Sequence, residues 1–203
     1  MFESVFIALD GPDGCGKSTQ AKLLAEHIES LGVKVQTFRD PGSTAIGEKI
    51  RDILLDAENS QMSDRTELLL YMACRAQLYE EAIAPALNKK HCVIIDRWLS
   101  STCAYQGCAG GVGMETVLDI AGHSLTRVWP DLTIILDVDL STSAARMVRD
   151  LDRMEQKGDS YHEKVRQGFL SLAELRDDIV VIEASADIQA VHKKVVKTVN
   201  DLL

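Results

Sequence analysis

The sequence predicts an α/β protein in which helices flank a five-stranded parallel β-sheet on both faces, giving three layers. Two observations favour this fold class. Five short runs rich in β-branched residues recur along the 203 residues, with helical patterns between them. Several of these runs are apolar almost throughout, as is typical of parallel strands covered on both faces. The alternation of strands and helices indicates an open sheet with right-handed crossovers.

The elements are expected in a regular order. The predicted strands are residues 5–10, 33–38, 92–96, 132–138 and 179–184. The predicted helices lie near residues 17–30, 47–57, 64–88, 114–122, 141–156, 160–176 and 187–202. No linker rich in Pro, Gly or Ser divides the chain, so residues 1–203 are expected to form one domain.

Composition narrows the function classes. The chain is 46% apolar and 26% charged, which is typical of a soluble globular protein. With 22 basic and 31 acidic residues its net charge is −9, so no nucleic-acid partner is expected. The start lacks a basic n-region, and no apolar run approaches the roughly 18 residues of a membrane span, so neither a signal peptide nor a membrane partner is expected. Five cysteines without a C-x-x-C pair favour reduced thiols and a cytoplasmic location.

The stretch GPDGCGKS, residues 11–18, fits G-x-x-x-x-G-K-[ST] between a predicted strand and a predicted helix. Its glycines let successive N–H groups turn inward around an anion, and the following helix adds its positive end. Lys17 supplies a charge for the β and γ phosphates, and Ser18 a hydroxyl for Mg²⁺. The predicted ATP-binding residues are Gly11, Asp13, Gly14, Cys15, Gly16, Lys17, Ser18 and Thr19.

Switch GTPases, motor or transport ATPases and small-molecule kinases share this loop. A GTPase should carry N-K-x-D after a late strand, but the string at 88–91 is NKKH and precedes a strand. The D-x-x-G match at 119–122 lies in a helical pattern rather than at a strand end. Both matches are interpreted as coincidence, which leaves ATPases and kinases.

Charged residues follow two further strands. Asp96 ends an apolar strand, the usual place of a second Mg²⁺ partner in such proteins, and Arg97 comes directly after it. Arg39 ends the second strand. Because the carboxyl ends of parallel strands line the ligand crevice, two guanidinium groups there suggest a second phosphate beside the triphosphate. A buried Asp–Arg ion pair is the alternative interpretation of Asp96 and Arg97.

Six blocks together are more specific than any one motif. They are GPDGCGKSTQ (11–20), RDPGST (39–44), ELLLYMACRAQL (67–78), DRWLSSTCAYQG (96–107), PDLTIILDVD (130–139) and DRMEQKG (152–158). Their combination and order resemble the bacterial thymidylate kinase family over nearly the whole chain. The resemblance implies a P-loop kinase fold, Mg²⁺-dependent transfer of the ATP γ-phosphate to dTMP in dTTP synthesis, and a homodimer. The remaining alternatives are a kinase for another nucleotide or nucleoside, and a regulatory P-loop ATPase.

The resemblance also implies roles for acceptor-site residues. It assigns Asp13 to the 3′-hydroxyl, Arg39 and Arg97 to the monophosphate, Tyr71 to stacking on the base, Arg75 to the base edge, Thr102 to a hydrogen bond with the base, and Tyr105 to exclusion of a 2′-hydroxyl, with Gln106 beside it. Without the resemblance, the favoured interpretation is that Tyr71 fills the core and that Arg75 keeps its charge at the surface. The resemblance also suggests a cis bond before Pro41.

A lid is expected near residues 141–160. Arg146, Arg149 and Arg153 recur at i, i+3 and i+7, which would place them on one stripe of a helix. Interspersed acidic residues leave a solvated, salt-bridged face as the alternative. Because the interior of the phosphate loop holds no basic residue, the resemblance implies a catalytic lid arginine. Arg153 is the first candidate and Arg149 the second, acting with Lys17 and Arg97.

Overall fold

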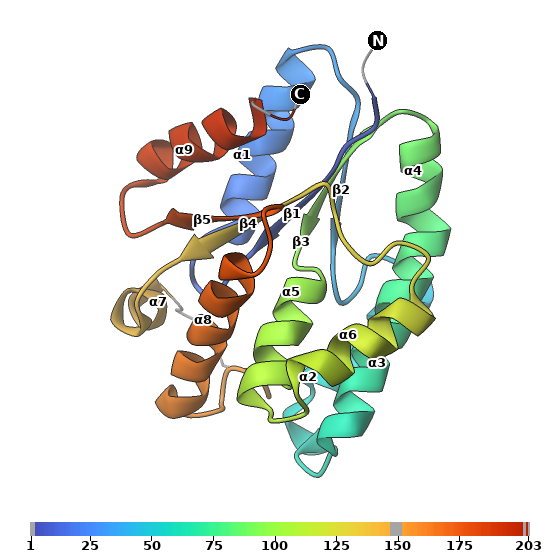
Figure 1. Ribbon diagram of the computed structural model, residues 1–203, viewed down its shortest axis with the longest axis vertical. Helices are drawn as coiled ribbons and strands as arrows, with labels where there is room; N and C mark the ends of the chain where they lie inside the picture. The colour runs from blue at the N-terminus through green and yellow to red at the C-terminus, as the bar shows by residue number, and fades with distance from the viewer. Residues whose placement is uncertain (1–2, 147–151, 201, 203) are drawn as a thin grey trace.

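The structure is a computed structural model that describes residues 3–146, 152–200 and 202. Its sheet has five parallel strands in the order β2-β3-β1-β4-β5 (Figure 1). The strands are β1 (Phe6–Asp10), β2 (Val35–Arg39), β3 (Cys92–Asp96), β4 (Leu132–Asp137) and β5 (Ile179–Glu183). The predicted fold class is therefore confirmed.

The described helices connect and cover these strands. They are α1 (Lys17–Ser30), α2 (Ala45–Leu55), α3 (Asp64–Leu78), α4 (Ala84–Asn88), α5 (Leu99–Thr102), α6 (Met114–Ser124), α7 (Leu140–Arg146), α8 (Asp159–Glu174) and α9 (Ile188–Asn200). A π-helical turn, Tyr79–Ile83, joins α3 to α4, and a second one, Cys103–Ala109, extends α5. The single helix predicted at 64–88 is thus one helical stretch with a π-turn inside it.

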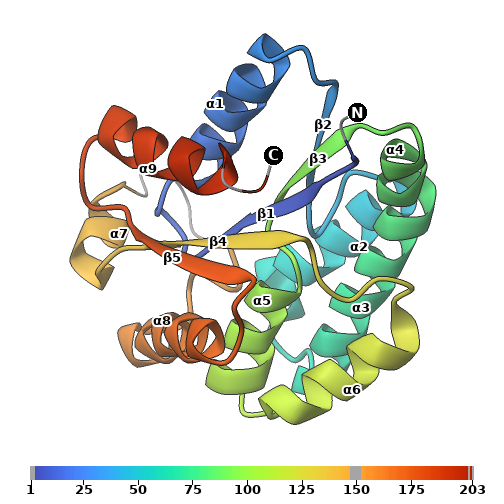
Figure 2. The same ribbon diagram turned by 45° about the horizontal axis from the view of Figure 1, so that its top comes forward.

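The sheet has a separate apolar core on each face because side chains alternate along a strand. In β1, Ile7 and Leu9 belong to the core under α1 and α9, whereas Phe6 and Ala8 belong to the core under the helices of the other face. Figure 2 shows α1 and α9 on one side of the sheet and α3, α5 and α8 on the other. Burial on both faces explains why the strand sequences are so uniformly apolar.

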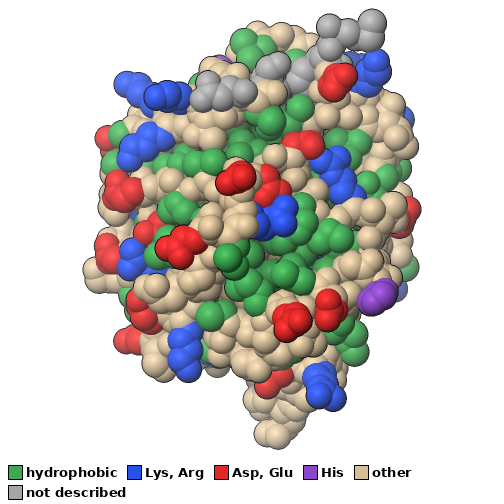
Figure 3. Space-filling model, viewed as in Figure 1, with side chains coloured by type: hydrophobic (Ala, Val, Ile, Leu, Met, Phe, Trp, Pro, Cys, Tyr) green, Lys and Arg blue, Asp and Glu red, His purple; other side chains and the backbone are tan. Residues whose placement is uncertain are grey.

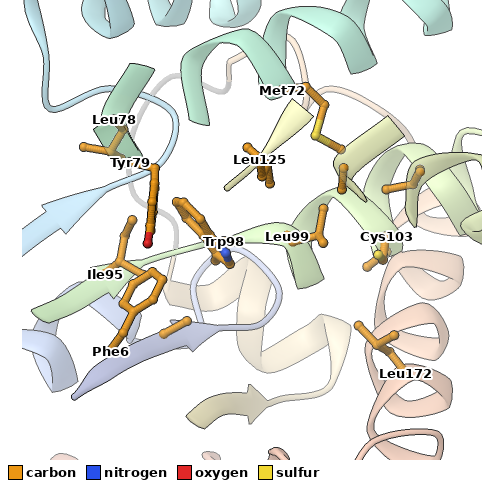
Figure 4. Close-up of a cluster of buried hydrophobic side chains, with 14 of the residues drawn as sticks. Phe6, Met72, Leu78, Tyr79, Ile95, Trp98, Leu99, Cys103, Leu125 and Leu172 are labelled. Atoms are coloured by element: carbon orange, nitrogen blue, oxygen red, sulfur yellow. The ribbon is translucent and has the colours of Figure 1, made fainter. Parts of the chain in front are cut away.

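Trp98 anchors the chain where it leaves β3. Its side chain is fully buried, its ring meets that of Phe6 edge-on at 5.2 Å, and its indole N–H donates to the carbonyl of Val128 at 2.9 Å. Figure 4 shows Trp98 among the side chains of the core, with Phe6, Ile95 and Tyr79 near it. This packing fixes the segment that carries Arg97.

The structure differs from the predicted helices in two places. Of the helix expected over 141–156, the described residues up to Arg146 are helical, whereas residues 153–156 form turns before α8 begins; residues 147–151 lie outside the described residues. The carboxylate of Asp152 accepts hydrogen bonds from the backbone N–H groups of Met154 and Glu155, a local pattern that competes with a helix. Arg153 therefore does not continue the helix of Arg146. In addition, the helical stretch 99–109 was not predicted at all.

Figure 3 shows basic and acidic side chains scattered over the face that α5, α6 and α8 form, with apolar side chains between them. Among the described helices, none combines the length and the apolar character that a membrane crossing requires.

Candidate active site

The phosphate-binding loop lines a cavity of about 760 Å³ at the carboxyl edge of the sheet. Gly16, with φ of 97°, precedes the first turn of α1, and Gly14 has φ of 72°. A Cβ on Gly14 would lie 2.6 Å from the carbonyl oxygen of Ser143, so the loop also needs glycine there for close packing against α7. Lys17 Nζ donates to the carbonyl oxygen of Pro12 at 2.7 Å, which folds the cation over its own loop.

A hydroxyl and a carboxylate meet beside this loop. Ser18 Oγ donates to Asp96 Oδ2 at 2.6 Å, although the residues are far apart in sequence. They come together because β1 and β3 are neighbours and both end at the same edge. Mg²⁺ in nucleotide sites is held by one or two such oxygen ligands together with substrate phosphates and waters. The donor set therefore fits the predicted metal partners.

Asp10 fixes the turn after β3. Its buried carboxylate accepts from the backbone N–H groups of Trp98 and Ser101, at 3.2 and 2.9 Å, and from the hydroxyls of Ser100 and Ser101, at 2.5 and 2.6 Å. These bonds tie the start of α5 to the end of β1. Arg97 lies inside this turn with φ of 70°, in the left-handed region that non-glycine residues rarely adopt. The network supplies the constraint that holds it there.

Asp13, Arg97 and Tyr105 form a connected group. The Arg97 guanidinium is ion-paired with Asp13 Oδ1 and lies 5.3 Å from the centre of the Tyr105 ring, and the Tyr105 hydroxyl donates to Asp13 Oδ2 at 2.8 Å. Burial alone would raise the pKa of Asp13. The charges of Arg97 and Lys17 and the bond from Tyr105 outweigh burial and hold that pKa well below its usual range. Asp13 is therefore an acceptor-only group held in a fixed position.

A second, smaller pocket of about 110 Å³ adjoins the first. Asp13, Arg97 and Asp40 line both. The other predicted acceptor-site residues that line the smaller pocket are Tyr71, Arg75, Thr102, Tyr105 and Gln106. The structure thus brings all the predicted acceptor-site residues together except Arg39.

Arg39 lies at the rim of the larger cavity instead. Its side chain is 52% exposed and is ion-paired with Glu48 at 2.7 Å. Arg51 of α2, which the sequence did not single out, lines both pockets and donates to the carbonyl oxygen of Pro41 at 3.0 Å. Burial and the nearby charge of Arg39 lower the pKa of Arg51. In the sequence Arg51 belongs to no motif and follows no strand; it only lies within the helix predicted at 47–57.

Arg75 is buried and holds two parts of the smaller pocket. Its Nε and Nη2 both lie 2.6 Å from Asp40 Oδ2, and Nη2 donates to Thr102 Oγ1 at 2.9 Å. Burial raises the pKa of Asp40, against the opposing charge of Arg75. The Asp40–Pro41 bond is cis, as the resemblance suggested. Arg75 therefore joins the turn after β2 to the helix after β3.

A family model described as Thymidylate kinase matches residues 9–195. This chain belongs to the thymidylate kinase family. It is 42% identical to the thymidylate kinase of Caldanaerobacter subterraneus over 200 residues, which cover 98% of this chain and 96% of that one. It is also 42% identical to the thymidylate kinase of Thermosipho africanus over 192 residues, covering 94% and 95%. The crystal structure of thymidylate kinase from Ehrlichia chaffeensis superposes with a TM-score of 0.80 at 32% identity, covering 98% of this chain and 99% of that one.

The predicted lid arginines of this kinase lie in different places. Arg146 is exposed, lines the larger cavity and donates to the carbonyl oxygen of Ala184 at 3.1 Å. Arg149 is outside the described residues. Arg153 is buried on the acceptor side, where Nε donates to the carbonyl oxygen of Leu54 at 2.8 Å and Nη1 lies 2.6 Å from Glu67. A catalytic role for Arg153 or Arg149 therefore stays a prediction.

The far wall of the larger cavity was not predicted. It consists of residues that follow β5 and begin α9, namely Ala184, Ala186, Asp187, Ile188 and Val191. Gln20 of α1 supports this wall by donating to the carbonyl oxygen of Ile188 at 3.0 Å. The usable signal was topological, since β5 ends at the same edge of the sheet as the phosphate-binding strand.

Proposed function

We propose that this kinase transfers the γ-phosphate of ATP to dTMP, giving ADP and dTDP, with ATP in the larger cavity and dTMP in the smaller pocket. The observation that carries this assignment is that the two cavities adjoin and share Asp13 and Arg97. Two phosphorylated ligands placed there would meet end to end beside Arg97. The segment 184–188 lines only the larger cavity and not the smaller pocket, so we expect the adenine of ATP to lie against it.

Catalysis in such a site is mainly alignment and charge stabilisation. The phosphate of a nucleoside monophosphate is already largely ionised at neutral pH, because its second pKa is about 6. No strong general base is therefore needed to activate it. Lys17 lies where it can balance charge on the donor phosphates, and Arg97 lies between donor and acceptor. Arg51 is the second cation that would face the acceptor phosphate, in the place first given to Arg39.

The residues that would hold Mg²⁺ are Ser18 directly and Asp96, the latter through water. At that position Mg²⁺ would supply positive charge to offset the negative charge of the donor phosphates. The hydrogen bond between the two side chains keeps both ligands at the mouth of the loop.

The nucleoside half of dTMP would fill the smaller pocket. Tyr71 offers a ring for stacking, and Asp13 an acceptor for the 3′-hydroxyl. Thr102 already accepts a hydrogen bond from Arg75, so its own hydroxyl hydrogen can point at the base. Tyr105 is 6% exposed and fixed by Asp13, so it forms a rigid wall beside the sugar.

A coupled assay of ADP release tests the function. Mg-ATP would be offered with dTMP, dUMP, CMP, AMP or no acceptor. Strong turnover with dTMP, and its loss when EDTA removes the divalent ion, are expected. Equal release of ADP without any acceptor would instead indicate an ATPase, and a preference for another nucleotide would reassign the smaller pocket.

We also infer that the enzyme acts as a cytoplasmic homodimer that pairs through α2 and α3. These helices contact each other, and both leave large apolar side chains in solvent: Ile46 is 51%, Ile53 47% and Leu69 56% exposed. A second copy of the chain would cover them, consistent with the dimer implied by the resemblance. Reduced cysteines and the use of ATP support the cytoplasmic location.

Leu69→Glu is expected to shift the protein from dimer to monomer, because a carboxylate at the centre of an apolar contact is costly to bury. Sedimentation of wild type and variant at matched concentrations measures the change. Leu175→Glu is the control, since Leu175 is 74% exposed at the end of α8 and away from the proposed interface. A wild-type protein that sediments as a monomer would contradict the dimer.

A further inference from the structure

We propose that Glu67 is a positioning residue for base recognition. It holds the Gln106 amide with its carbonyl toward the acceptor pocket, and it fastens the segment 152–157 over the same pocket. The inference rests on the proposed function, because it requires the base of a nucleotide to lie beside Gln106. Neither the motif nor the resemblance gave Glu67 a role.

Glu67 dictates which way the Gln106 amide points. Gln106 Nε2 donates to Glu67 Oε1 at 2.8 Å, and both side chains are almost completely buried. A carboxylate can only accept, so the amide must offer its nitrogen to Glu67. The carbonyl oxygen, which lies opposite the nitrogen in the planar amide group, is then directed away from Glu67. Since Gln106 lines the acceptor pocket and Glu67 does not, that oxygen is presented to the ligand.

Cations keep this carboxylate in place. Arg153 Nη1 lies 2.6 Å and Lys157 Nζ 3.7 Å from Glu67 Oε2, the oxygen that Gln106 does not use. Glu67 is 2% exposed and would be costly to bury without such partners. The two oxygens therefore have different roles, since one orients the amide and the other binds the segment 152–157.

The bound segment forms a wall of the same pocket. Asp152, Met154 and Glu155 line it, and Met154 is 4% exposed. Arg153 is held a second time by the carbonyl oxygen of Leu54 at 2.8 Å. Glu67 therefore positions both the pocket wall formed by residues 152–155 and the Gln106 amide that would contact the base.

The Gln106 carbonyl oxygen would favour a base that can donate a hydrogen bond to it. A thymine or uracil ring carries a hydrogen on N3 and can donate it to the Gln106 carbonyl, whereas N3 of cytosine carries a lone pair that the carbonyl would repel. Binding sites that pair with a ligand hydrogen bond discriminate strongly against partners that lack it. The orientation set by Glu67 thus selects pyrimidines with an N3–H group.

Two variants separate the two roles of Glu67. Arg153→Met removes the fastening of the segment but leaves the carboxylate for Gln106. The double variant Glu67→Met with Arg153→Met removes both and leaves no buried charge from this pair uncompensated. The measured quantity is the ratio of kcat/KM for dTMP to that for dCMP, with thermal unfolding to verify the fold. Arg153→Met should raise the KM for dTMP but keep the ratio, whereas the double variant should lower the ratio at least about tenfold.

Glu81→Met is the matched control, because Gln77 Nε2 donates to Glu81 Oε2 at 2.6 Å in an exposed pair on the same helical stretch. It should leave the ratio unchanged.

A folded double variant with the ratio of Arg153→Met would overturn the proposal. If the double variant does not fold, Gln106→Met decides, since it must lower the ratio if the amide reads N3. A wild-type enzyme without dTMP turnover would refute the proposed function itself, whereas normal wild-type turnover with an unchanged ratio in the variants refutes this inference alone.

Discussion

Replacing Arg97 with methionine is expected to lower kcat/KM for dTMP by about 10³-fold or more, the range found for arginines that stabilise phosphoryl transfer. Arg97 lines both cavities, so its charge would lie where donor and acceptor phosphates repel each other. It also orients Asp13, which it shares with Tyr105. Because the charge acts mainly in the transition state, kcat should fall more than the KM for ATP rises.

The control is Arg127→Met. Arg127 forms an i,i+4 ion pair with Asp131 at 2.6 Å, and both side chains are about one third exposed. Exposed pairs contribute little, so this variant should keep wild-type kinetics. An Arg97→Met enzyme with wild-type kcat/KM would remove Arg97 from the mechanism.

The stability of the Arg97→Met variant relative to wild type should also depend on pH. The folded-state pKa of Asp13 is held below its ordinary value of 3.8, so its contribution to stability is fully present above that value and is lost as the pH falls through the folded pKa. Without Arg97 the shift is smaller, and so is the contribution. The stability gap between wild type and Arg97→Met should therefore narrow as denaturant unfolding is measured from neutral pH to below 3.8.

The positions of the glycine-rich loop and of the proposed metal ligands, Ser18 and Asp96, could be predicted because their signals are local. Glycines and Lys17 lie at fixed spacing between a strand and a helix, and Ser18 and Asp96 follow strands whose carboxyl ends share one edge. The direction of parallel strands suffices to place them, whatever the order of the strands.

The position of Arg51, the proposed second cation for the acceptor phosphate, could not be predicted in the same way. Arg39 ends a strand, but β2 is the edge strand of the sheet, and its side chain turns outward to Glu48. Arg51 reaches the pockets because α2 packs against α3, a tertiary contact that periodicity does not encode. Strand–helix alternation gives the number and direction of the strands but not their order, and here β2, which carries Arg39, lies at the edge of the sheet, so that Arg51 and not Arg39 lines the smaller pocket.

Polar side chains explain the two differences between the predicted and the observed helices. The stretch 99–109 has no clear apolar stripe, because Ser100, Ser101, Thr102 and Gln106 are buried and bonded to Asp10, Arg75 and Glu67. Arginine spacing predicted a helix at 141–156, but Asp152 bonds the backbone of its own turn, and Arg153 is drawn to Glu67. In both places polar contacts, from distant elements and at Asp152 also from its own turn, override the pattern read from the sequence.

Replacing Arg75 with methionine is expected to lower the free energy of unfolding by about 3–5 kcal/mol, the cost of breaking a buried ion pair on one side. Arg75 is 1% and Asp40 2% exposed. Asp40 Oδ1 has no hydrogen-bond partner in the described part of the chain, so the contact of Oδ2 with Arg75 supplies the hydrogen-bonded compensation of this charge. Urea unfolding of wild type and variant measures the loss.

A second replacement tests this cause. With Asp40→Asn added to Arg75→Met, most of the loss should be recovered, because no uncompensated charge remains. Recovery should stop about 1 kcal/mol short for each lost hydrogen bond to Thr102 and to the carbonyl oxygen of Trp98. A double variant no more stable than Arg75→Met would show that those bonds, and not the ion pair, carry the energy.

Acid supplies an independent check of the same cause. Burial raises the pKa of Asp40 even with Arg75 beside it, and removing Arg75 would raise it further. For a carboxyl group whose folded pKa lies above the unfolded value, folding becomes more favourable as the pH falls through the folded pKa. The Arg75→Met variant should therefore regain stability relative to wild type on mild acidification, whereas the variant that also carries Asp40→Asn should not, because it has no carboxyl group left to protonate at that position.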